Sequence, residues 1–590
     1  MKNSNKNYAY YKVHYIKDLR DLVNMRCEMY PDTPVFTLKH QPSILDSAVS
    51  TGKNGWYDIK PETYRNDIIK LGSGLLKIWN ESNPNKDTLP RIAILSETRY
   101  EWYVSFGAVT NGLGIVIPLD RMLHADELVS MFERAEINMV IYSGKYEQIV
   151  NNIKEACPSL VAAVRMDEPK SSDNAVSSNR TYDLRTVMNM TSDYEEYKNL
   201  KINPSEVGML LFTSGTTSKS KIVMLSQQNI CSDIMSMFQM CNMCGDTFLT
   251  VLPLHHTYEC TCGFLGQVFS GSTVAVGDGL SRFTNDLLLA KPTCLCIVPA
   301  ILEKFYSKIE KKLNESAFKR FTFKSALSLS KFLLNFNIDI RRKLFKSIHD
   351  NFGGNLRLVF MGGAPCDSSI VKFFNDIGIT VLQGYGLTEC APLIAVNRDC
   401  YHKNDSAGIT AVGCEIKVFN PDLEGNGELI VKGNNVFLGY YGDEEATRAV
   451  FDSNGYFHTG DIGHIDSDGF VYITGRLKNV IIAKNGKNVF PEELEFLINK
   501  SPYICECIVS AYNDEAKNDL YIKATVFPDF EAVNDKFGYN PTEDELKSLI
   551  NDEISKVNMR LENFQKIKKT ELRDTEFAKS STHKIKRYVS

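Results

Sequence analysis

Residues 213–221, Thr-Ser-Gly-Thr-Thr-Ser-Lys-Ser-Lys, combine residue types that suit the binding of a phosphate group. No bulky side chain blocks the approach of an anion, so backbone N–H groups and hydroxyls can surround it. Lys221 adds a positive charge at the far end. Nucleotide phosphates are the expected ligand, although Ser- and Thr-rich turns also occur as ordinary strand–helix loops. The stretch is not a P-loop, because Ser220 stands where that pattern requires glycine.

A second candidate site follows the apolar run at 356–360 and the stretch Val-Leu-Gln at 381–383. Both runs end in glycine-containing turns, Met-Gly-Gly-Ala-Pro at 361–365 and Gly-Tyr-Gly-Leu-Thr-Glu at 384–389. In the second turn Tyr385 offers a flat ring for stacking on adenine, and Thr388 offers a hydroxyl to a phosphate. Glu389 offers the hard oxygen ligand that Mg²⁺ prefers. A surface loop with a solvated glutamate is the alternative for either turn taken alone.

A third pattern pairs Asp461, in Thr-Gly-Asp, with Arg476, in Ile-Thr-Gly-Arg, across a hairpin signal at 467–469. A carboxylate can accept from two adjacent hydroxyl groups, because it has two oxygens. The alternative is a surface ion pair, which contributes little to stability.

These stretches, in this order, resemble the motifs of the adenylate-forming enzymes, the superfamily of acyl-CoA synthetases, luciferases and peptide-synthetase adenylation domains. Ser218, Ser220 and Ile222 depart from the family pattern in the first stretch, and His583 departs from it near the end of the chain. The resemblance implies binding of ATP, with Asp461 accepting from the ribose hydroxyls and Arg476 bracing the sugar. The nucleotide-binding residues that it implies are Thr213, Ser214, Gly215, Thr216, Thr217, Lys221, Gly363, Ala364, Pro365, Gly384, Tyr385, Gly386, Asp461 and Arg476.

The tail at 577–587 resembles the family's terminal Thr-x-Gly-Lys-Ile-x-Arg motif, and its matching lysine is Lys584. The resemblance implies that Lys584 bridges carboxylate and phosphate oxygens, that Thr388 holds the α-phosphate and that Glu389 binds Mg²⁺. A merely solvated basic tail is the alternative. Lys478 fills the family's hinge position, which implies an N-terminal domain at 1–475 and a mobile C-terminal lid at 476–590.

The acid substrate is indicated by weaker patterns. Residues 251–259 resemble the family segment whose histidine, here His256, lies at the mouth of the acyl pocket. The Val-Pro-x-x-x-Glu-Lys segment at 298–304 is similar to that of long-chain fatty acyl-CoA synthetases. The insertion at 305–355 is rich in Lys, Arg, Phe and Leu, which suits a helix that contacts membrane lipid or a solvated helical pair.

The resemblance therefore implies an ATP-dependent acyl-CoA synthetase. Such an enzyme activates a medium- or long-chain fatty acid as acyl-AMP, releases pyrophosphate and passes the acyl group to coenzyme A. The alternatives are an adenylating ligase for an aryl acid or an acyl-carrier protein, and a binding or regulatory homologue.

Composition excludes several other classes. The 590 residues carry a net charge of -5, which is no footprint for nucleic acid. No apolar run is long enough to span a bilayer, and the N-terminus is too polar for a signal peptide. We therefore expect a cytoplasmic protein, with peripheral membrane contact as an option, whose 15 cysteines are reduced.

The fold class is predicted to be α/β, since strand-like apolar runs alternate with helical stretches. We expect mostly parallel sheets flanked by helices, a smaller β-rich subdomain at 435–472 and an α+β lid. The predicted strands are 91–95, 114–117, 139–142, 209–212, 248–252, 273–276 and 356–360. The ligand loops should lie at the carboxyl ends of these strands.

Overall fold

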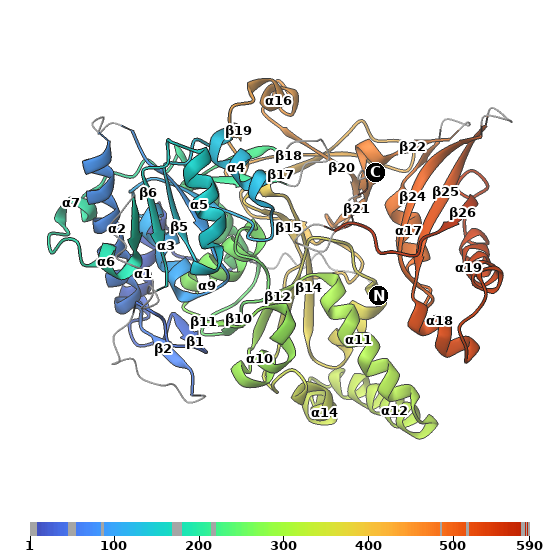
Figure 1. Cartoon of the computed structure of the whole chain (residues 1–590). Helices are drawn as coiled ribbons and strands as arrows, with labels where there is room; N and C mark the ends of the chain where they lie inside the picture. The colour runs from blue at the N-terminus through green and yellow to red at the C-terminus, as the bar shows by residue number, and fades with distance from the viewer. Residues whose placement is uncertain are drawn as a thin grey trace. The chain divides into compact units, whose positions relative to one another are not determined.

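The computed structural model describes residues 9–44, 55–83, 88–167, 180–213, 220–483, 487–514, 519–579, 585 and 587 (Figure 1). Its contacts divide the chain into two compact units. The first comprises Met1–Gly215, Lys219–Glu415 and Val431–Phe457, and the second is formed mainly by Ile416–Ile430 and His458–Ser590.

The first unit contains a nine-stranded sheet in the order β16-β15-β14-β13-β12-β10-β11-β1-β2. The six strands from β14 to β1 in this order are parallel, and β2, β15 and β16 pair antiparallel at the two edges. The strands are β1 (Phe36–Leu38), β2 (Tyr57–Ile59), β10 (Thr247–Leu249), β11 (Thr273–Val276), β12 (Cys294–Ile297), β13 (Leu358–Met361), β14 (Thr380–Gly386), β15 (Leu393–Val396) and β16 (Ile409–Thr410).

A second, eight-stranded sheet of the same unit has the order β19-β9-β8-β4-β3-β5-β6-β7. Strands β8 to β7 are parallel, whereas β9 and β19 extend the sheet antiparallel. The strands are β3 (Arg91–Leu95), β4 (Ile115–Pro118), β5 (Met139–Tyr142), β6 (Ala162–Arg165), β7 (Thr181–Asp183), β8 (Val207–Phe212), β9 (Ile222–Ser226) and β19 (Gly439–Tyr440).

Helices cover both faces of the eight-stranded sheet, as the apolar runs predict. Ala93 and Leu95 of β3 join a buried cluster with α4 and α5, while the alternate residues Ile92 and Ile94 are equally buried on the opposite face. Every residue of α3 is buried, which places this helix inside the unit. The helices of the first unit are α1 (Leu19–Met29), α2 (Pro61–Ser82), α3 (Tyr100–Thr110), α4 (Ala125–Arg134), α5 (Glu147–Ala156), α6 (Leu184–Met188), α7 (Glu195–Lys198), α8 (Gln227–Met240), α9 (Gly266–Phe269), α10 (Phe283–Ala290), α11 (Pro299–Asn314), α12 (Ala317–Leu334), α13 (Arg341–Leu344), α14 (Lys346–Asp350), α15 (Ser368–Asp376) and α16 (Glu444–Ala449).

Helix α8 begins just after Leu225, with Ser226 as its N-cap. The Ser226 side chain accepts from the Asn229 amide at the start of α8, and the Asn229 side chain accepts from the Ser226 amide in return. This reciprocal capping satisfies two backbone donors that the first turn leaves without a partner. The strand β9, which immediately precedes α8, was not expected from the sequence.

The second unit has its own core. A three-stranded sheet of β24 (Ile504–Asp514), β25 (Asp519–Pro528) and β26 (Ile567–Leu572) packs against helices α17 (Pro491–Ile498) and α19 (Glu543–Asn558). The remaining elements are α18 (Phe530–Phe537), β22 (Ile481–Ile482) and β23 (Asn488–Val489). Pro491 stands in the first turn of α17, where its missing N–H has no intrahelical partner to lose.

A four-stranded sheet, mostly of the second unit, has the order β17-β18-β20-β21. Its strands are β17 (Cys414–Phe419), β18 (Gly427–Gly433), β20 (Phe457–Ile465) and β21 (Val471–Arg476). The prediction of one β-rich subdomain at 435–472 was wrong in its bounds. Two strands of this sheet precede residue 435, and Gly439–Tyr440 instead extends the eight-stranded sheet as β19. No helix in the described ranges is long and apolar enough to cross a membrane.

Candidate active site

Four neighbouring parallel strands, β10, β12, β13 and β14, deliver their following segments to one edge of the nine-stranded sheet. A Cβ built on Gly362, just after β13, would lie 3.7 Å from the carbonyl oxygen of Gly384 in β14. The two glycine turns predicted from the sequence are therefore adjacent. Gly363 has φ +86° and, like Ala364 and Pro365, is exposed, so this turn presents its backbone to solvent.

Tyr385 lies within β14 rather than in the loop that the sequence suggested. The strand continues through Gly384, Tyr385 and Gly386 because β15 pairs with it antiparallel, with Tyr385 opposite Ala395. A Cβ on Gly386 would come 2.0 Å from the Pro392 carbonyl oxygen, so only glycine fits this position. Tyr385 is half-buried, which keeps part of its ring accessible.

Glu389 stands in the short 3₁₀ helix η4 (Thr388–Cys390), directly after this strand. Its Oε1 accepts a hydrogen bond of 3.1 Å from the Tyr440 hydroxyl of β19. Its carbonyl oxygen accepts from the Phe437 amide at 2.8 Å. Both the backbone and the side chain of Glu389 are thus fixed by the segment that leads into β19.

Lys221 also lies beside Tyr440. Its Nζ is 4.2 Å from the centre of the Tyr440 ring, a cation–π arrangement that orients the ammonium group. The Thr213 amide donates to the Lys221 carbonyl oxygen at 3.0 Å, which closes the base of the β8–β9 connection. Ser214, Gly215, Thr216 and Thr217 lie outside the described residues.

Arg134 is a basic residue at this loop that the sequence did not reveal. Its guanidinium donates to the Ser220 hydroxyl at 3.2 Å and to the Ser220 carbonyl oxygen. It reaches the loop from the last residue of α4, and its Cζ lies 5.9 Å from the Phe212 ring centre. Arg134 and Lys221 therefore place two positive charges at the base of the Ser/Thr-rich stretch.

The residues around Glu389 fit a Mg²⁺ ion. The carboxylate is half-buried, and the bond from Tyr440 to Oε1 holds its orientation without consuming all of its acceptor capacity. Mg²⁺ in phosphate sites takes one or two protein carboxylates and completes its shell with phosphate oxygens and water. Within the described ranges no cluster of three or more His, Cys, Asp or Glu side chains forms a separate metal centre.

His256 follows β10 at the same sheet edge, and its ring centre is 4.1 Å from that of His255. The Nε2 atom of His255 lies 3.6 Å from Asp120 Oδ2. Burial lowers the pKa of His255, so that its imidazole is neutral near pH 7. The chain that follows both histidines forms the π-helix η2 (Tyr258–Leu265). This helix continues into α9 and is buried from Glu259 onward.

The second unit pairs Asp461 with Arg476 across the hairpin of β20 and β21. The two residues are opposite each other in register, and Arg476 Nε lies 2.7 Å from Asp461 Oδ1. The Asp461 side chain is 5% exposed and that of Arg476 is 42% exposed, so the carboxylate is presented from a buried position. Lys478 follows in η5 (Leu477–Asn479) and is exposed. Lys584 lies outside the described residues.

The structure thus brings Lys221, Tyr385, Thr388 and Glu389 into one neighbourhood of the first unit, together with Arg134 and Tyr440. It also joins Asp461 to Arg476 within the second unit. Local sequence reasoning missed Tyr440 as well as Arg134, because the pairing of Tyr440 with Val223 in β9 joins residues more than two hundred positions apart. The aromatic pair Tyr440-Tyr441, beside a glycine, was the one local sign of a strand there.

Known proteins resemble this chain in both sequence and fold. The chain is 29% identical over 539 residues to the rat "Long-chain-fatty-acid--CoA ligase 5", covering 84% of this chain and 76% of the relative. It is 27% identical to "Fatty acyl-CoA synthetase A" of Dictyostelium discoideum, covering 83% of this chain and 74% of that protein. Its fold resembles that of the Bacillus subtilis o-succinylbenzoate coenzyme A synthetase solved with ATP and a magnesium ion, with a TM-score of 0.69, 20% identity and coverage of 96% and 98%.

A second solved relative by fold is the anthranilate CoA ligase in complex with anthranoyl-AMP, with a TM-score of 0.72, 16% identity and coverage of 98% and 96%. The family model described as "AMP-binding enzyme" matches residues 86–441, which include the loop base at Lys221, the β14 edge with Glu389 and the β19 tyrosine that holds it. By this match over more than half its length, the chain belongs to the AMP-binding enzyme family.

Proposed function

We propose that this protein is an ATP-dependent acyl-CoA synthetase that acts on a medium- or long-chain fatty acid. In the first half-reaction a carboxylate oxygen attacks the α-phosphorus of ATP, and the bond to the leaving pyrophosphate breaks. In the second, the sulfur of coenzyme A attacks the carbonyl carbon of the acyl-AMP, AMP leaves and the thiol proton passes to solvent. The observation that carries the proposal is the Glu389–Tyr440–Lys221 group beside the β14 glycine turn.

The first unit supplies the phosphate chemistry. Glu389 would hold Mg²⁺, which when bound neutralises negative charge on the phosphate oxygens. Tyr440 keeps the Glu389 carboxylate in one orientation. Lys221, whose ammonium group packs over the Tyr440 ring, supplies a positive charge. Thr388 is placed to donate to the α-phosphate, and Tyr385 to stack on adenine. The main contribution of these residues is to position two anions and to stabilise the charge that develops between them.

The second unit supplies the ribose contact and the lysine of the first half-reaction. Asp461 accepts from the ribose hydroxyls while Arg476, already paired with it, braces the sugar. Lys584 bridges the carboxylate and phosphate oxygens. The lid is the segment from 476 to 590, and Lys478 is its hinge for the exchange between adenylation and thioester formation. Its exposed position in a short 3₁₀ turn suits a backbone that changes conformation.

We assign the binding of the carboxylic acid substrate to His256 and to the buried helical segment at 259–269 that follows it. The residues from 259 to 269 are all buried and mostly apolar, which suits an acyl chain better than a charged substrate. The relatives named as long-chain-fatty-acid–CoA ligases support the same class of acid. The aryl-acid ligases among the solved relatives by fold make an aromatic carboxylate the alternative.

The deciding assay is AMP release that depends on coenzyme A, measured across a series of saturated fatty acids and aromatic acids. We expect turnover with the fatty acids and little with benzoate-type acids. The reverse preference would replace the fatty acid by an aryl acid. If none of the acids supports AMP release, in a folded protein that still binds ATP, the assignment as a synthetase is excluded.

A lysine variant tests whether Lys584 acts in the first half-reaction but not in the second. Lys584→Ala should remove most adenylation, measured as pyrophosphate release, and leave thioester formation from preformed acyl-AMP largely intact. Lys568→Ala is the matched control, because Lys568 is an exposed lysine on β26 of the same unit. Equal loss of both half-reactions in Lys584→Ala would contradict the assigned role.

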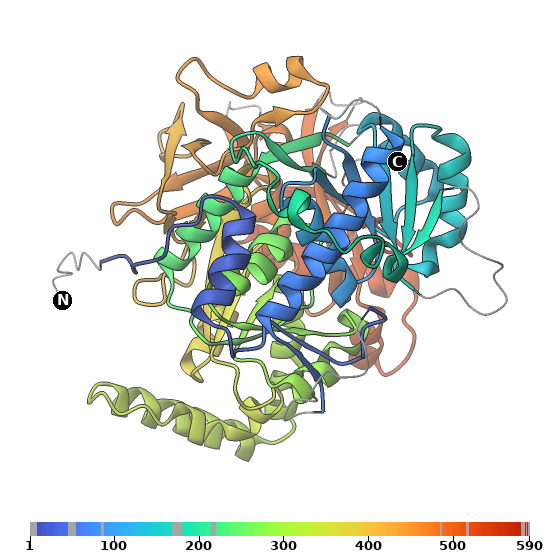
Figure 2. The same cartoon turned by 90° about the vertical axis from the view of Figure 1, so that its left-hand side faces the viewer.

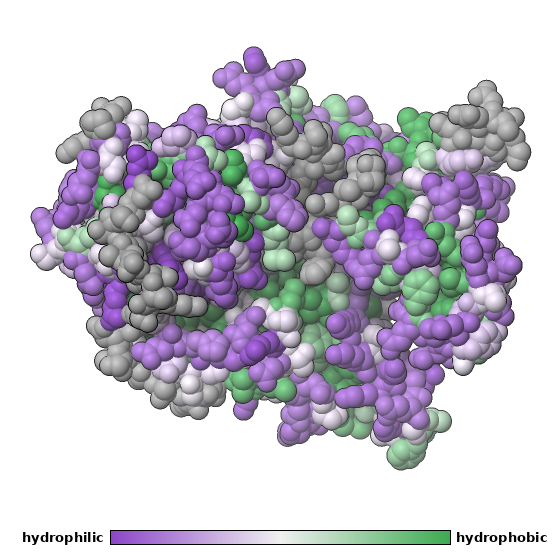
Figure 3. Space-filling model, in the orientation of Figure 1, coloured by the Kyte–Doolittle hydropathy of each residue, from purple (hydrophilic) through white to green (hydrophobic). Residues whose placement is uncertain are grey.

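We further propose cytoplasmic localisation with peripheral contact to a membrane surface through α12. Four phenylalanines of this helix and the turn after it, Phe318, Phe321, Phe332 and Phe336, have exposed fractions of 77%, 70%, 59% and 62%. Exposed lysines and arginines flank them, among them Lys319, Arg320, Lys324 and Lys331. Figure 2 shows α12 along the outer edge of its unit, and Figure 3 shows hydrophobic colour beside hydrophilic colour over this helix. Aromatic side chains among cations are typical of a helix that lies in a lipid interface.

The other side of α12 explains why these rings are not core residues. Phe323, Ala326 and Leu327 pack against the buried cluster beneath the nine-stranded sheet. Co-sedimentation with anionic vesicles should therefore be reduced by the double variant Phe332→Ser/Phe336→Ser and by added salt. Leu423→Ser is the control, since Leu423 is fully exposed in a turn elsewhere. Binding that is absent, or insensitive to both changes, would exclude membrane contact through α12.

A further inference from the structure

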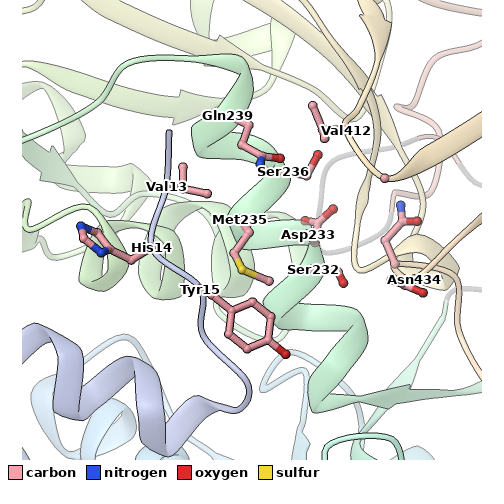
Figure 4. A pocket seen from close by; sticks show the side chains of 12 residues that line it. Val13, His14, Tyr15, Ser232, Asp233, Met235, Ser236, Gln239, Val412 and Asn434 are labelled. Atoms are coloured by element: carbon pink, nitrogen blue, oxygen red, sulfur yellow. The ribbon is translucent and has the colours of Figure 1, made fainter. Parts of the chain in front are cut away.

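A cavity of about 320 Å³ lies beside α8, outside the group of residues assigned to nucleotide binding. Figure 4 shows Asp233 and Ser236 on the side of α8 that turns toward Val412 and Asn434. The extended segment at 13–15 passes along another side of the cavity. All of these residues belong to the first unit.

Three of the residues that line this cavity each carry a buried polar atom without a hydrogen-bond partner in the described part of the chain. These atoms are Asp233 Oδ2, Ser236 Oγ and Asn435 Oδ1. The three residues are 1%, 4% and 5% exposed. Such groups are rare in folded proteins, because an unpaired buried acceptor loses its hydration without compensation.

The other atoms of the same side chains fix their positions. The Leu393 amide donates to Asp233 Oδ1 at 3.0 Å, and Asn435 Nδ2 donates to the Leu393 carbonyl oxygen at 2.6 Å. One residue of β15 therefore anchors both the carboxylate and the amide. The set of acceptors is built into the fold rather than left on mobile surface side chains.

The chemistry of the lining selects the ligand. Asn435 Oδ1 only accepts hydrogen bonds, as Asp233 Oδ2 does when the carboxylate is ionised, and the Ser236 hydroxyl can also accept. No lysine or arginine is among the described residues that line the cavity, and His14 is the one basic side chain among them. Val13, Met235 and Val412 add apolar surface. The volume is at the lower end of the range for small-molecule sites and far larger than the roughly 30 Å³ of one water molecule.

We propose that this cavity is a binding site for a small organic ammonium ion. The N–H groups of the ion donate to Asp233, Ser236 and Asn435, and its carbon body lies against Met235 and Val412. Burial raises the pKa of the Asp233 carboxyl well above its usual range, and a cation is the kind of ligand that favours the charged carboxylate.

The anchoring residue also connects the cavity to the nucleotide site. Leu393 pairs with Gly386 of β14, next to Tyr385. On the other side, Asn435 precedes by two residues the Phe437 amide that donates to the Glu389 carbonyl oxygen. If the proposed function holds, an occupied cavity should change the KM for ATP. Binding itself can be measured without any enzyme activity.

Calorimetry on the full chain with n-butylammonium chloride tests the binding site. The comparison ligands are 1-butanol and sodium butyrate, with ionic strength matched by sodium chloride. We expect saturable heat and a raised Tm with butylammonium alone. Asp233→Asn should weaken binding by about tenfold or more, since it removes the charge but keeps the acceptor for Leu393. Asp126→Asn, an exposed change on α4, should leave the affinity unaltered.

Ser236→Val supplies a second variant, which occupies part of the cavity and should also weaken binding. Circular dichroism of both variants verifies that each is folded before its affinity is compared. Equal binding of 1-butanol would refute recognition of the cation, and full affinity in Asp233→Asn would refute the role of the carboxylate. Absence of any saturable heat with butylammonium would mean that the cavity holds water alone and would overturn the proposal.

Discussion

Replacing Glu259 by glutamine should make the first unit more stable at pH 8 and change little at pH 5. Glu259 lies on the π-helix η2 with none of its surface exposed. Neither of its carboxyl oxygens makes a well-formed hydrogen bond in the described ranges, and only weak interactions with the backbone amides of Val251 and Leu252 reach them. A Cβ on Gly263 would come 2.7 Å from the Glu259 Cδ, so glycine makes room for this carboxyl. Burial raises the pKa of Glu259 from 4.5 to about 8, against the smaller opposing effect of the backbone amides of Val251 and Leu252.

The sign of the pH effect follows from where the proton is held. Below pH 4.5 both the folded and the unfolded chain carry it, so the group contributes no pH-dependent cost. As pH rises from 4.5 to about 8, the unfolded chain releases the proton while the folded chain keeps it. The free energy of unfolding therefore falls with pH across this window. At 1.36 kcal/mol per pKa unit the loss is at most about 5 kcal/mol.

Thermal unfolding of the wild type and Glu259→Gln at several pH values between 5 and 8.5 measures this difference. The glutamine resembles the protonated acid in size and polarity, so its Tm should exceed that of the wild type increasingly as pH rises. Glu101→Gln is the control, because Glu101 is also buried but accepts from the Ser43 amide at 2.7 Å and from Arg99 Nε at 2.7 Å. It should lower the Tm at every pH. Parallel curves for wild type and Glu259→Gln would show that the carboxyl ionises normally and would refute the reasoning.

Three further changes test the site. Tyr440→Phe removes the bond to Glu389 Oε1, so pyrophosphate release should fall about tenfold, with partial recovery at high Mg²⁺; unchanged release would show that Tyr440 does not orient the carboxylate. Arg476→Ala frees Asp461 from its ion pair and should raise the KM for ATP, with partial rescue by Arg476→Lys; a normal KM would remove Arg476 from the nucleotide site. Lys478→Pro should block thioester formation while adenylation persists, and equal rates of both half-reactions would contradict a hinge at this position.

The sheets were predictable where strands are buried on both faces. The runs 91–95, 139–142 and 273–276 coincide with β3, β5 and β11, because uninterrupted apolar residues of this length leave few alternatives to a central parallel strand. Strands with one exposed face were harder to find. Only Ile416 of β17 is buried, among alternating polar residues, and neither β17 nor β18 was expected.

The candidate site was predictable residue by residue but not as an arrangement. Motif resemblance located Lys221, Glu389, Asp461 and Arg476, since each lies within a distinctive local stretch. It could not locate Arg134 or Tyr440, because neither belongs to a motif of that kind and both reach the site through tertiary pairing. The same limit applies to Asp233 and Asn435, which share a partner in Leu393 although they are two hundred residues apart.

The way in which Glu389 is held implies that its position depends on both large sheets. Its backbone continues from β14 of the nine-stranded sheet, whereas Tyr440, which donates to its carboxylate, is a residue of β19 in the eight-stranded sheet. β19 is short: Gly439 and Tyr440 lie opposite Met224 and Val223 of β9, and the flanking Leu438 and Tyr441 amides donate to carbonyl oxygens of β9. A slip of one residue there would turn the Tyr440 side chain to the opposite face of the sheet. The strand β9 that fixes this register also begins directly after Lys221. Correct spacing between the lysine and the carboxylate is therefore a property of β9 and β19.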